Sequence, residues 1–159
     1  MHSMFGIFKK KTFEDEFSAL QADIVDICNE YSKGFSDKIY IYVANEGMIL
    51  AHHFYCINNK MFDCQELNDA GLSVEFDVSE NCQEQVLDIL NEDILKIQAL
   101  CEKYTKPVPK LMKITYEPKT KKFNADYKYE NQTSDDVSVF DNDDAWFEEE
   151  KAKLEGASA

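Results

Sequence analysis

The chain has 159 residues, of which 44% are hydrophobic, and its formal net charge is −14 at pH 7. This length and apolar content suit one globular domain with a sizeable core and leave too little chain for two full domains. The charge argues against direct binding of nucleic acid, because contact with the phosphate backbone needs clustered cations, and every one of the 17 basic residues is a lysine.

The two ends of the chain are expected to lie outside the folded domain. Residues 1–11 combine a short apolar stretch with three lysines and predict an N-terminal arm, residues 12–155 form the domain, and residues 156–159 form a disordered tail. The lysines follow the apolar stretch, which is the reverse of a secretory signal, and the chain has no run of about 18 apolar residues. We therefore expect a soluble, cytoplasmic protein that does not contact membranes.

The cysteines favour a reducing compartment. There are five of them, an odd number without CxxC spacing, which is more typical of reduced and mostly buried thiols than of a disulfide framework or a zinc site. Cys28 and Cys101 lie on or beside apolar helical stripes, so we expect both to be buried and unreactive.

Two amphipathic helices are predicted, over Thr12–Lys33 and Ser79–Tyr104. In each, apolar residues recur every three or four positions and so share one side of a helix. A Thr12–Asp15 capping box begins the first helix, Ser79 caps the second, and Pro107 prevents the second from continuing. The apolar stripes are Phe13, Phe17, Leu20, Ile24, Ile27 and Tyr31 in the first helix, and Val86, Leu90, Ile94, Ile97, Cys101 and Tyr104 in the second.

The remaining periodic segments predict an antiparallel sheet. Asp37–Val43, Met48–Ile57 and Met61–Leu67 are rich in β-branched and aromatic residues and are separated by polar turns, which indicates a three-stranded meander. Leu111–Tyr116 and Phe123–Tyr129 flank another polar turn and form a hairpin with one apolar face. Val74–Val78 also alternates, and it is either a short edge strand or an extended lead-in to the second helix.

These elements predict an α+β fold, with a mostly antiparallel sheet packed on one face by the two long helices and followed by an acidic C-terminal helix. Tyr40 and Tyr42 make the opposite face of the first strand apolar as well. That face is either half covered or an interaction surface.

The acidity is concentrated near the C-terminus. Residues 130–155 contain ten acidic residues and two lysines, a net charge of −8, and Asp143 or Asp144 is expected to cap the last helix. In one interpretation this segment is solvated and its aromatic residues fold back on the core. In a second interpretation it is a partner surface, in which the aromatic residues anchor the contact and the carboxylates select a basic partner. A divalent-cation loop at 141–144 is less consistent with the sequence, because the glycine and distal glutamate of an EF-hand are missing.

Under the second interpretation the partner-binding residues are Asp135, Asp136, Phe140, Asp141, Asp143, Asp144, Trp146, Phe147, Glu148, Glu149 and Glu150.

No catalytic, cofactor or metal site is predicted. His52 and His53 are adjacent on a strand and point to opposite faces, so they cannot jointly hold one metal ion, and we expect one in the core and one at the surface. Cys56 or Cys64 could approach a histidine, but no neighbouring cation or helix N-terminus is evident to activate a thiol. Glycine-rich phosphate loops and common hydrolase motifs are absent from the sequence.

The order of elements resembles the YezG-like family of bacterial immunity proteins, over most of residues 12–154. The resemblance rests on Lys38–Val43 after the first helix, Val78–Glu80 at the start of the second, Lys122–Glu130 in the last strand, and Trp146 in the final helix. The chain differs from the family in having Lys33–Ser36 where a proline and a tryptophan precede the first strand, and Val108–Lys110 where a tryptophan precedes the fourth.

This resemblance implies a non-catalytic immunity protein, or antitoxin, that binds and neutralises a cognate secreted toxin domain. The toxin expected from this resemblance is a basic nuclease. The alternative is an acidic interaction or regulatory module for another basic partner, and a more remote possibility is an enzyme that uses His52 or His53 with Cys56.

Overall fold

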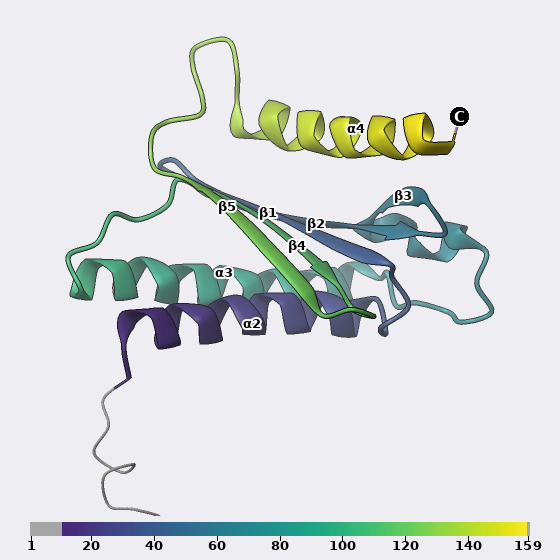
Figure 1. The fold of residues 1–159 in the computed structure, drawn as a ribbon, viewed down its shortest axis with the longest axis horizontal. Coiled ribbons are helices and arrows are strands. Elements are labelled where there is room, and N and C mark those ends of the chain that lie inside the picture. The colour runs from purple at the N-terminus through teal and green to yellow at the C-terminus, as the bar shows by residue number, and fades with distance from the viewer. Residues whose placement is uncertain (1–10, 159) are drawn as a thin grey trace, which may run out of the picture.

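The computed structural model of the protein describes residues 11–158, so the predicted arm at residues 1–11 lies, except for its last residue, outside the described part (Figure 1). Its elements, in chain order, are helix α2 (Phe13–Tyr31), strands β1 (Lys38–Asn45), β2 (Ile49–Ile57) and β3 (Lys60–Asp63), the 3₁₀ helix η1 (Cys64–Ala70), helix α3 (Glu80–Lys103), strands β4 (Leu111–Glu117) and β5 (Lys122–Lys128), and helix α4 (Val139–Ser158).

The five strands form one antiparallel sheet in the order β3-β2-β1-β4-β5. The predicted meander and hairpin join because β1 pairs with β4, in a register that sets Ile41 opposite Ile114. The α+β prediction is therefore confirmed.

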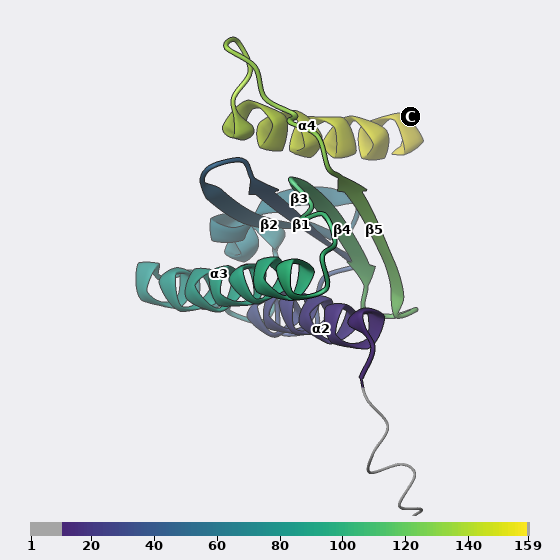
Figure 2. The same ribbon diagram turned by 90° about the vertical axis from the view of Figure 1, so that its left-hand side faces the viewer.

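Helices cover both faces of this sheet (Figures 1 and 2). Helices α2 and α3 lie side by side on one face, as predicted, and enclose the main core. Helix α4 lies across the opposite face, which we call the tyrosine face. The buried sheet residues of the tyrosine face are Tyr40, Tyr42, Ala44, Phe54, Cys56 and Leu111. Of the two outcomes left open for this face, the structure shows a covered one.

Local chemistry accounts for several element ends. The Thr12 hydroxyl accepts a hydrogen bond from the Asp15 amide at 3.1 Å, and the Asp15 carboxylate accepts one from the Thr12 amide, which is the predicted capping box. Asn58 and Asn59 both have positive φ angles, 52° and 62°. A two-residue hairpin turn needs this backbone, and asparagine tolerates it, so β2 folds directly back into β3.

Three element boundaries differ from the predictions, and one alternative that the sequence left open, at residues 74–78, is decided. The third strand ends at Asp63, because Asp63 and Glu66 form a capping box that starts η1. Residues 74–78 are an extended lead-in without a strand partner among the described residues, held by paired hydrogen bonds between Asn68 and the Phe76 backbone.

Helix α4 accounts for the other two differences. It begins at Val139, because Ser138 and Asp141 exchange side-chain to backbone hydrogen bonds, and Asp143 and Asp144 are therefore inside the helix instead of capping it. Its carboxyl end continues to Ser158, through residues that were predicted to form a disordered tail.

Leu90→Ala should lower the free energy of unfolding by about 2–5 kcal/mol, because Leu90 is completely buried and its removal leaves a cavity. Leu95→Ala is the matched control on the same helix, since Leu95 is 54% exposed, and its effect should stay below about 1 kcal/mol. Urea unfolding followed by circular dichroism measures both. Equal losses would show that α3 buries a different side.

Candidate functional site

The acidic C-terminal segment divides into exposed and buried residues. The exposed ones remain available to a partner, and Phe147 is half-buried. Asp143, Trp146 and Glu150 are buried within the chain. The exposed candidates are Asp135, Asp136, Phe140, Asp141, Asp144, Glu148 and Glu149.

Trp146 is the centre of the contact between α4 and the tyrosine face. It is only 6% exposed, and its ring centroid lies 5.1 Å from that of Phe54 and 5.7 Å from that of Tyr40. Phe147 packs edge-on against Phe54 at 5.1 Å. Trp146 therefore packs on the sheet, as in the interpretation in which the aromatic residues fold back on the core. For Trp146 to contact a partner directly, α4 would have to leave the sheet.

A cluster of three charged side chains joins the first part of α4 to the sheet through ion pairs. The Nδ1 atom of His52 on β2 lies 2.8 Å from a carboxylate oxygen of Asp143 on α4, and its Nε2 atom lies 2.7 Å from Asp63 at the end of β3. We call this group the His52 latch. It joins two consecutive strands, β2 and β3, to a helix whose Asp143 lies 91 residues from His52 in the sequence.

The geometry of the latch requires a charged histidine. Ionised carboxylates only accept hydrogen bonds, so both ring nitrogens of His52 must donate. Burial alone would lower the pKa of His52, but the hydrogen bonds to Asp143 and Asp63 raise it from 6.5 to about 12. Burial likewise opposes ionisation of Asp63, but its bond to His52 lowers the pKa of that carboxyl overall.

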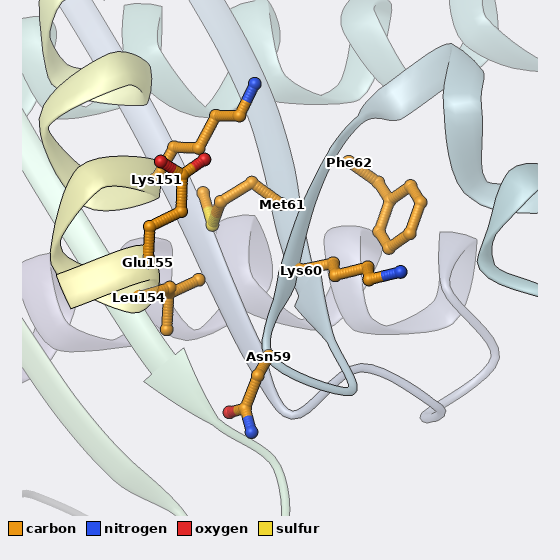
Figure 3. Close-up of a pocket in the computed structure, with 7 residues that line it drawn as sticks. All are labelled: Asn59, Lys60, Met61, Phe62, Lys151, Leu154 and Glu155. Carbon is orange, nitrogen blue, oxygen red and sulfur yellow. The ribbon is translucent and has the colours of Figure 1, made fainter. Parts of the chain in front are cut away.

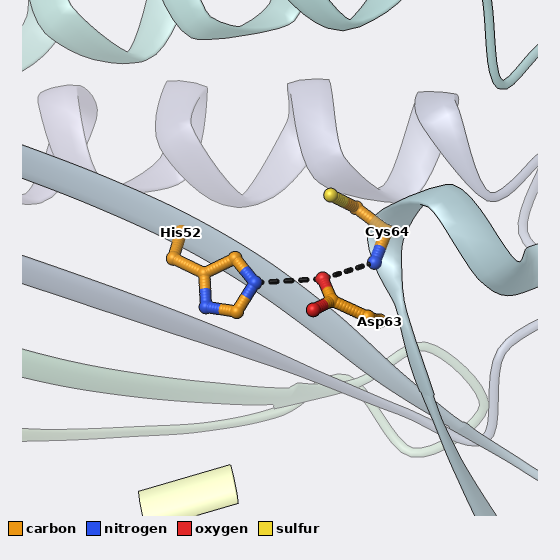
Figure 4. A group of neighbouring side chains, drawn as sticks. All are labelled: His52, Asp63 and Cys64. Carbon is orange, nitrogen blue, oxygen red and sulfur yellow. Dashed lines mark hydrogen bonds and ion pairs between the residues drawn. The ribbon is translucent and has the colours of Figure 1, made fainter. Parts of the chain in front are cut away.

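Cys64 lies beside the latch (Figure 4). Burial raises the pKa of its thiol, although His52 acts in the opposite direction, so the thiol stays protonated. His52 Nε2, an Asp63 oxygen and Cys64 Sγ lie within 4.8 Å of one another, and these donor types could hold a divalent metal ion. Such an ion would have to displace the Nε2 proton and the ion pair with Asp63.

His53 lies on the opposite face, as predicted for adjacent strand residues. Its Nδ1 is 2.6 Å from the Tyr55 hydroxyl, which donates to the Cys28 carbonyl. Burial is the main reason that the pKa of His53 falls to about 3, and the charge on His52 lowers it further. His53 is thus a neutral core residue, and His52 is partly covered by α4 instead of lying at the surface. Cys28 and Cys101 are both buried, as predicted.

A shallow pocket of about 500 Å³ lies where the carboxyl half of α4 passes β3 (Figure 3). Met61 points toward α4 and forms part of the floor with Leu154, and Lys151 and Glu155 lie on the helix side. The lining contains no histidine or cysteine that could act as a nucleophile or base near neutral pH.

Helices α2 and α3 carry a second concentration of acidic residues, which was not among the predicted partner-binding residues. Helix α2 has six acidic residues and no lysine, and α3 has six acidic residues and two lysines, so together they carry a formal net charge of −10. Ten of the twelve acidic residues are exposed, Glu16 is half-buried and Asp93 is buried. Lysines in the hairpins and loops offset these acidic residues, so the net charge of the chain outside residues 130–155 does not indicate how acidic the two helices are. Counting charges element by element reveals it from the sequence.

No protein-family model matches the chain, and no curated protein matches its sequence. In residues 11–158, no helix is long and apolar enough to cross a membrane.

Breaking the His52 latch should loosen α4. His52→Gln removes the charge and should reduce the free energy of unfolding by about 2–3 kcal/mol at pH 6, because the two carboxylates lose a charged donor. Trp146 is the only tryptophan, so its fluorescence should shift to the red as its burial is lost. Asp144→Asn, on the exposed side of the same helix turn, is the control and should change neither property.

The latch also predicts a pH dependence. Its histidine has a higher pKa in the folded chain than the ordinary 6.5, so its stabilisation is complete below about pH 6.5 and declines as the pH rises toward 12. The lowered pKa of Asp63 sets the acid limit, since that contribution is lost below about pH 4. The stability difference between wild type and His52→Gln should therefore be smaller at pH 9 than at pH 6. A constant difference would contradict a charged His52.

A buried carboxyl group with a raised pKa lies between α2 and α3. Burial and the neighbouring Asp23 raise the pKa of Asp93 from 3.8 to about 7, so folding is favoured by a protonated Asp93 and becomes less favourable as pH rises from about 4 to 7. Asp93→Asn should stabilise the protein by about 1–3 kcal/mol at pH 8 and have little effect at pH 4. Urea unfolding at both values, with exposed Asp88→Asn as control, tests this. An equal gain at both pH values would rule out the raised pKa.

Proposed function

We propose that this protein is a non-catalytic immunity protein that neutralises a basic toxin domain by stoichiometric association. The observation that carries the proposal is the distribution of charge over its helices. Helices α2 and α3 carry a net charge of −10, and the segment 130–155 around α4 carries −8, so acidic helices lie on both sides of the sheet.

An acidic surface of this kind suits an inhibitor of a nuclease. A nuclease binds a polyanion, so its substrate groove is cationic, and dense carboxylates can occupy or guard that groove. The same carboxylates repel nucleic acid, which keeps the inhibitor from binding the substrate itself. The cytoplasm of the protected cell is the compartment where such an inhibitor acts.

The chemistry of the described residues favours association over catalysis. His52 has both nitrogens engaged by carboxylates, and the neighbouring Cys64 thiol is protonated, so neither is poised to accept a proton from a substrate. The YezG-like resemblance of the element order supports the same function and remains a hypothesis about family membership.

The test is binding of the purified toxin domain encoded beside the gene for this protein. A variant with Asp136→Asn, Asp144→Asn and Glu148→Gln should associate about three- to tenfold more slowly at low salt, with a smaller difference at high salt, because exposed carboxylates steer a cationic partner. Stopped-flow kinetics and inhibition of nuclease activity are the measurements.

The matched control neutralises three exposed acids of α2, with Glu14→Gln, Asp26→Asn and Glu30→Gln. Both variants have the same net charge, so a general charge effect would slow them equally. Equal slowing would move the interface away from α4. Failure of the wild type to bind or inhibit the toxin domain would overturn the proposed function.

A further inference from the structure

One strand of the sheet has a half that is unpaired on its outer side. Strand β3 pairs only with Phe54–Ile57 of β2 and then turns away into η1. Residues Ile49–His53 pair with β1 on one side and have no strand neighbour on the other among residues 11–158.

The alternation of hydrogen-bonded and non-hydrogen-bonded residue pairs between β1 and β2 shows which backbone groups of β2 face this open edge. Glu46 N–H donates to Met48 C=O, so Glu46 and Met48 are a hydrogen-bonded pair. Because such pairs alternate in an antiparallel ladder, Leu50 and His52 bond with β1, and the N–H and C=O groups of Ile49 and Ala51 point outward.

Helix α3 runs alongside this edge. The Asn45 amide donates to Gln98 near the start of β2, at 3.2 Å, and the Cys64 thiol lies 3.8 Å from Gln83 beyond the open half. The stretch between these contacts carries Leu87 and Leu95, which are exposed on the helix side that also holds Gln98.

This side of α3 is acidic as well as apolar. Glu84, Asp88 and Glu102 follow the same helical spacing as Leu87 and Leu95 and are exposed. No lysine shares that side, since the two lysines of α3 project from the flank nearer α2, where both line a groove with residues of that helix.

Exposed apolar residues also lie above and at the end of the edge. Phe140 is 52% exposed and stands one helical turn before Asp143, which contacts His52 of β2. Met48 is 49% exposed and precedes β2 directly. An apolar rim with surrounding carboxylates therefore frames a strand edge whose outward N–H and C=O groups have no backbone partner within residues 11–158.

The other edge of the sheet is protected. Strand β5 carries Lys122, Asp126 and Lys128, and the turn before it adds two more lysines. Charged residues on an edge strand oppose pairing with another chain. Ile49, Leu50 and Ala51 carry no charge, and the charge of His52 is paired with Asp63 and Asp143, so the edge of β2 lacks this protection.

We infer that the Ile49–His53 edge is a docking site for an extended segment of the basic partner, in which lysine or arginine alternates with apolar residues. The segment adds a strand to the sheet through Ile49 and Ala51, and its cations face the acids of α3. A second copy of this chain is disfavoured, because its own α3 acids would be brought toward like charges. The inference rests on the proposed function and identifies how the partner binds.

The test uses a short synthetic peptide of alternating lysine and valine, with an alternating glutamate and valine peptide as the charge control. Ala51→Pro removes one outward N–H without removing a bond to β1, because Ala51 does not donate to that strand. Ala125→Pro is the matched control, since the same alternation places the Ala125 N–H on the outer side of β5.

Binding of the lysine peptide, measured by fluorescence anisotropy, should fall at least tenfold with Ala51→Pro and stay within twofold with Ala125→Pro. The peptide should also slow amide exchange at Ile49 and Ala51 in the wild type. Leu95→Lys gives a second variant that keeps the strand intact, and it should weaken binding about fivefold or more.

Three results would overturn the inference. They are no binding of the lysine peptide to the wild type, equal loss with Ala125→Pro, or dimerisation of the wild type that Ala51→Pro abolishes. A toxin domain that binds Ala51→Pro as tightly as wild type would remove this docking site and leave the proposed function standing. If the wild type binds the peptide but no toxin domain, the docking site would stand and the proposed function would be overturned.

Discussion

The protonated His52 between Asp63 and Asp143 is the interaction on which the arrangement of the chain depends. It fixes the end of β3, the start of η1 and the first half of α4 around one ring on β2. A half-buried cation with two carboxylates is stable only when all its hydrogen-bond donors are used, and here both nitrogens have acceptors. The adjoining packing of Trp146 on the tyrosine face supplies the apolar part of the same contact.

Covering both faces of the sheet determines what remains for a partner. The tyrosine face would be the natural apolar contact surface, but α4 occupies it, and the main core lies beneath α2 and α3. What stays accessible is the outer sides of the helices, which are acidic, and the edges of the sheet. The sides of the helices that face the sheet therefore form the apolar cores, and the sides that face solvent carry the charge.

The sequence predicts most of the fold because its helices and hairpins have clear local signals. Capping at Thr12 and the apolar stripe through Leu90 depend on neighbours within one or two turns, and both are as predicted. The start of α4 was misplaced because two consecutive aspartates look like caps, while Ser138 already fills that role. The His52 latch could not be predicted, since 91 residues separate His52 from Asp143 and only the fold brings them together.

The burial of Asp143 and Trp146 changes how the acidic segment can act. If the whole segment were a flexible binding tail, ordering it on a partner would carry an entropic penalty, and its charge would be spread over many conformations. Held by the latch, α4 instead presents Asp144 and Glu148 on a rigid surface, while Phe140 stays exposed near the open half of β2. In the proposed complex, charge on this rigid surface would set the rate of encounter, and backbone hydrogen bonds and apolar contacts at the neighbouring strand edge would set the lifetime.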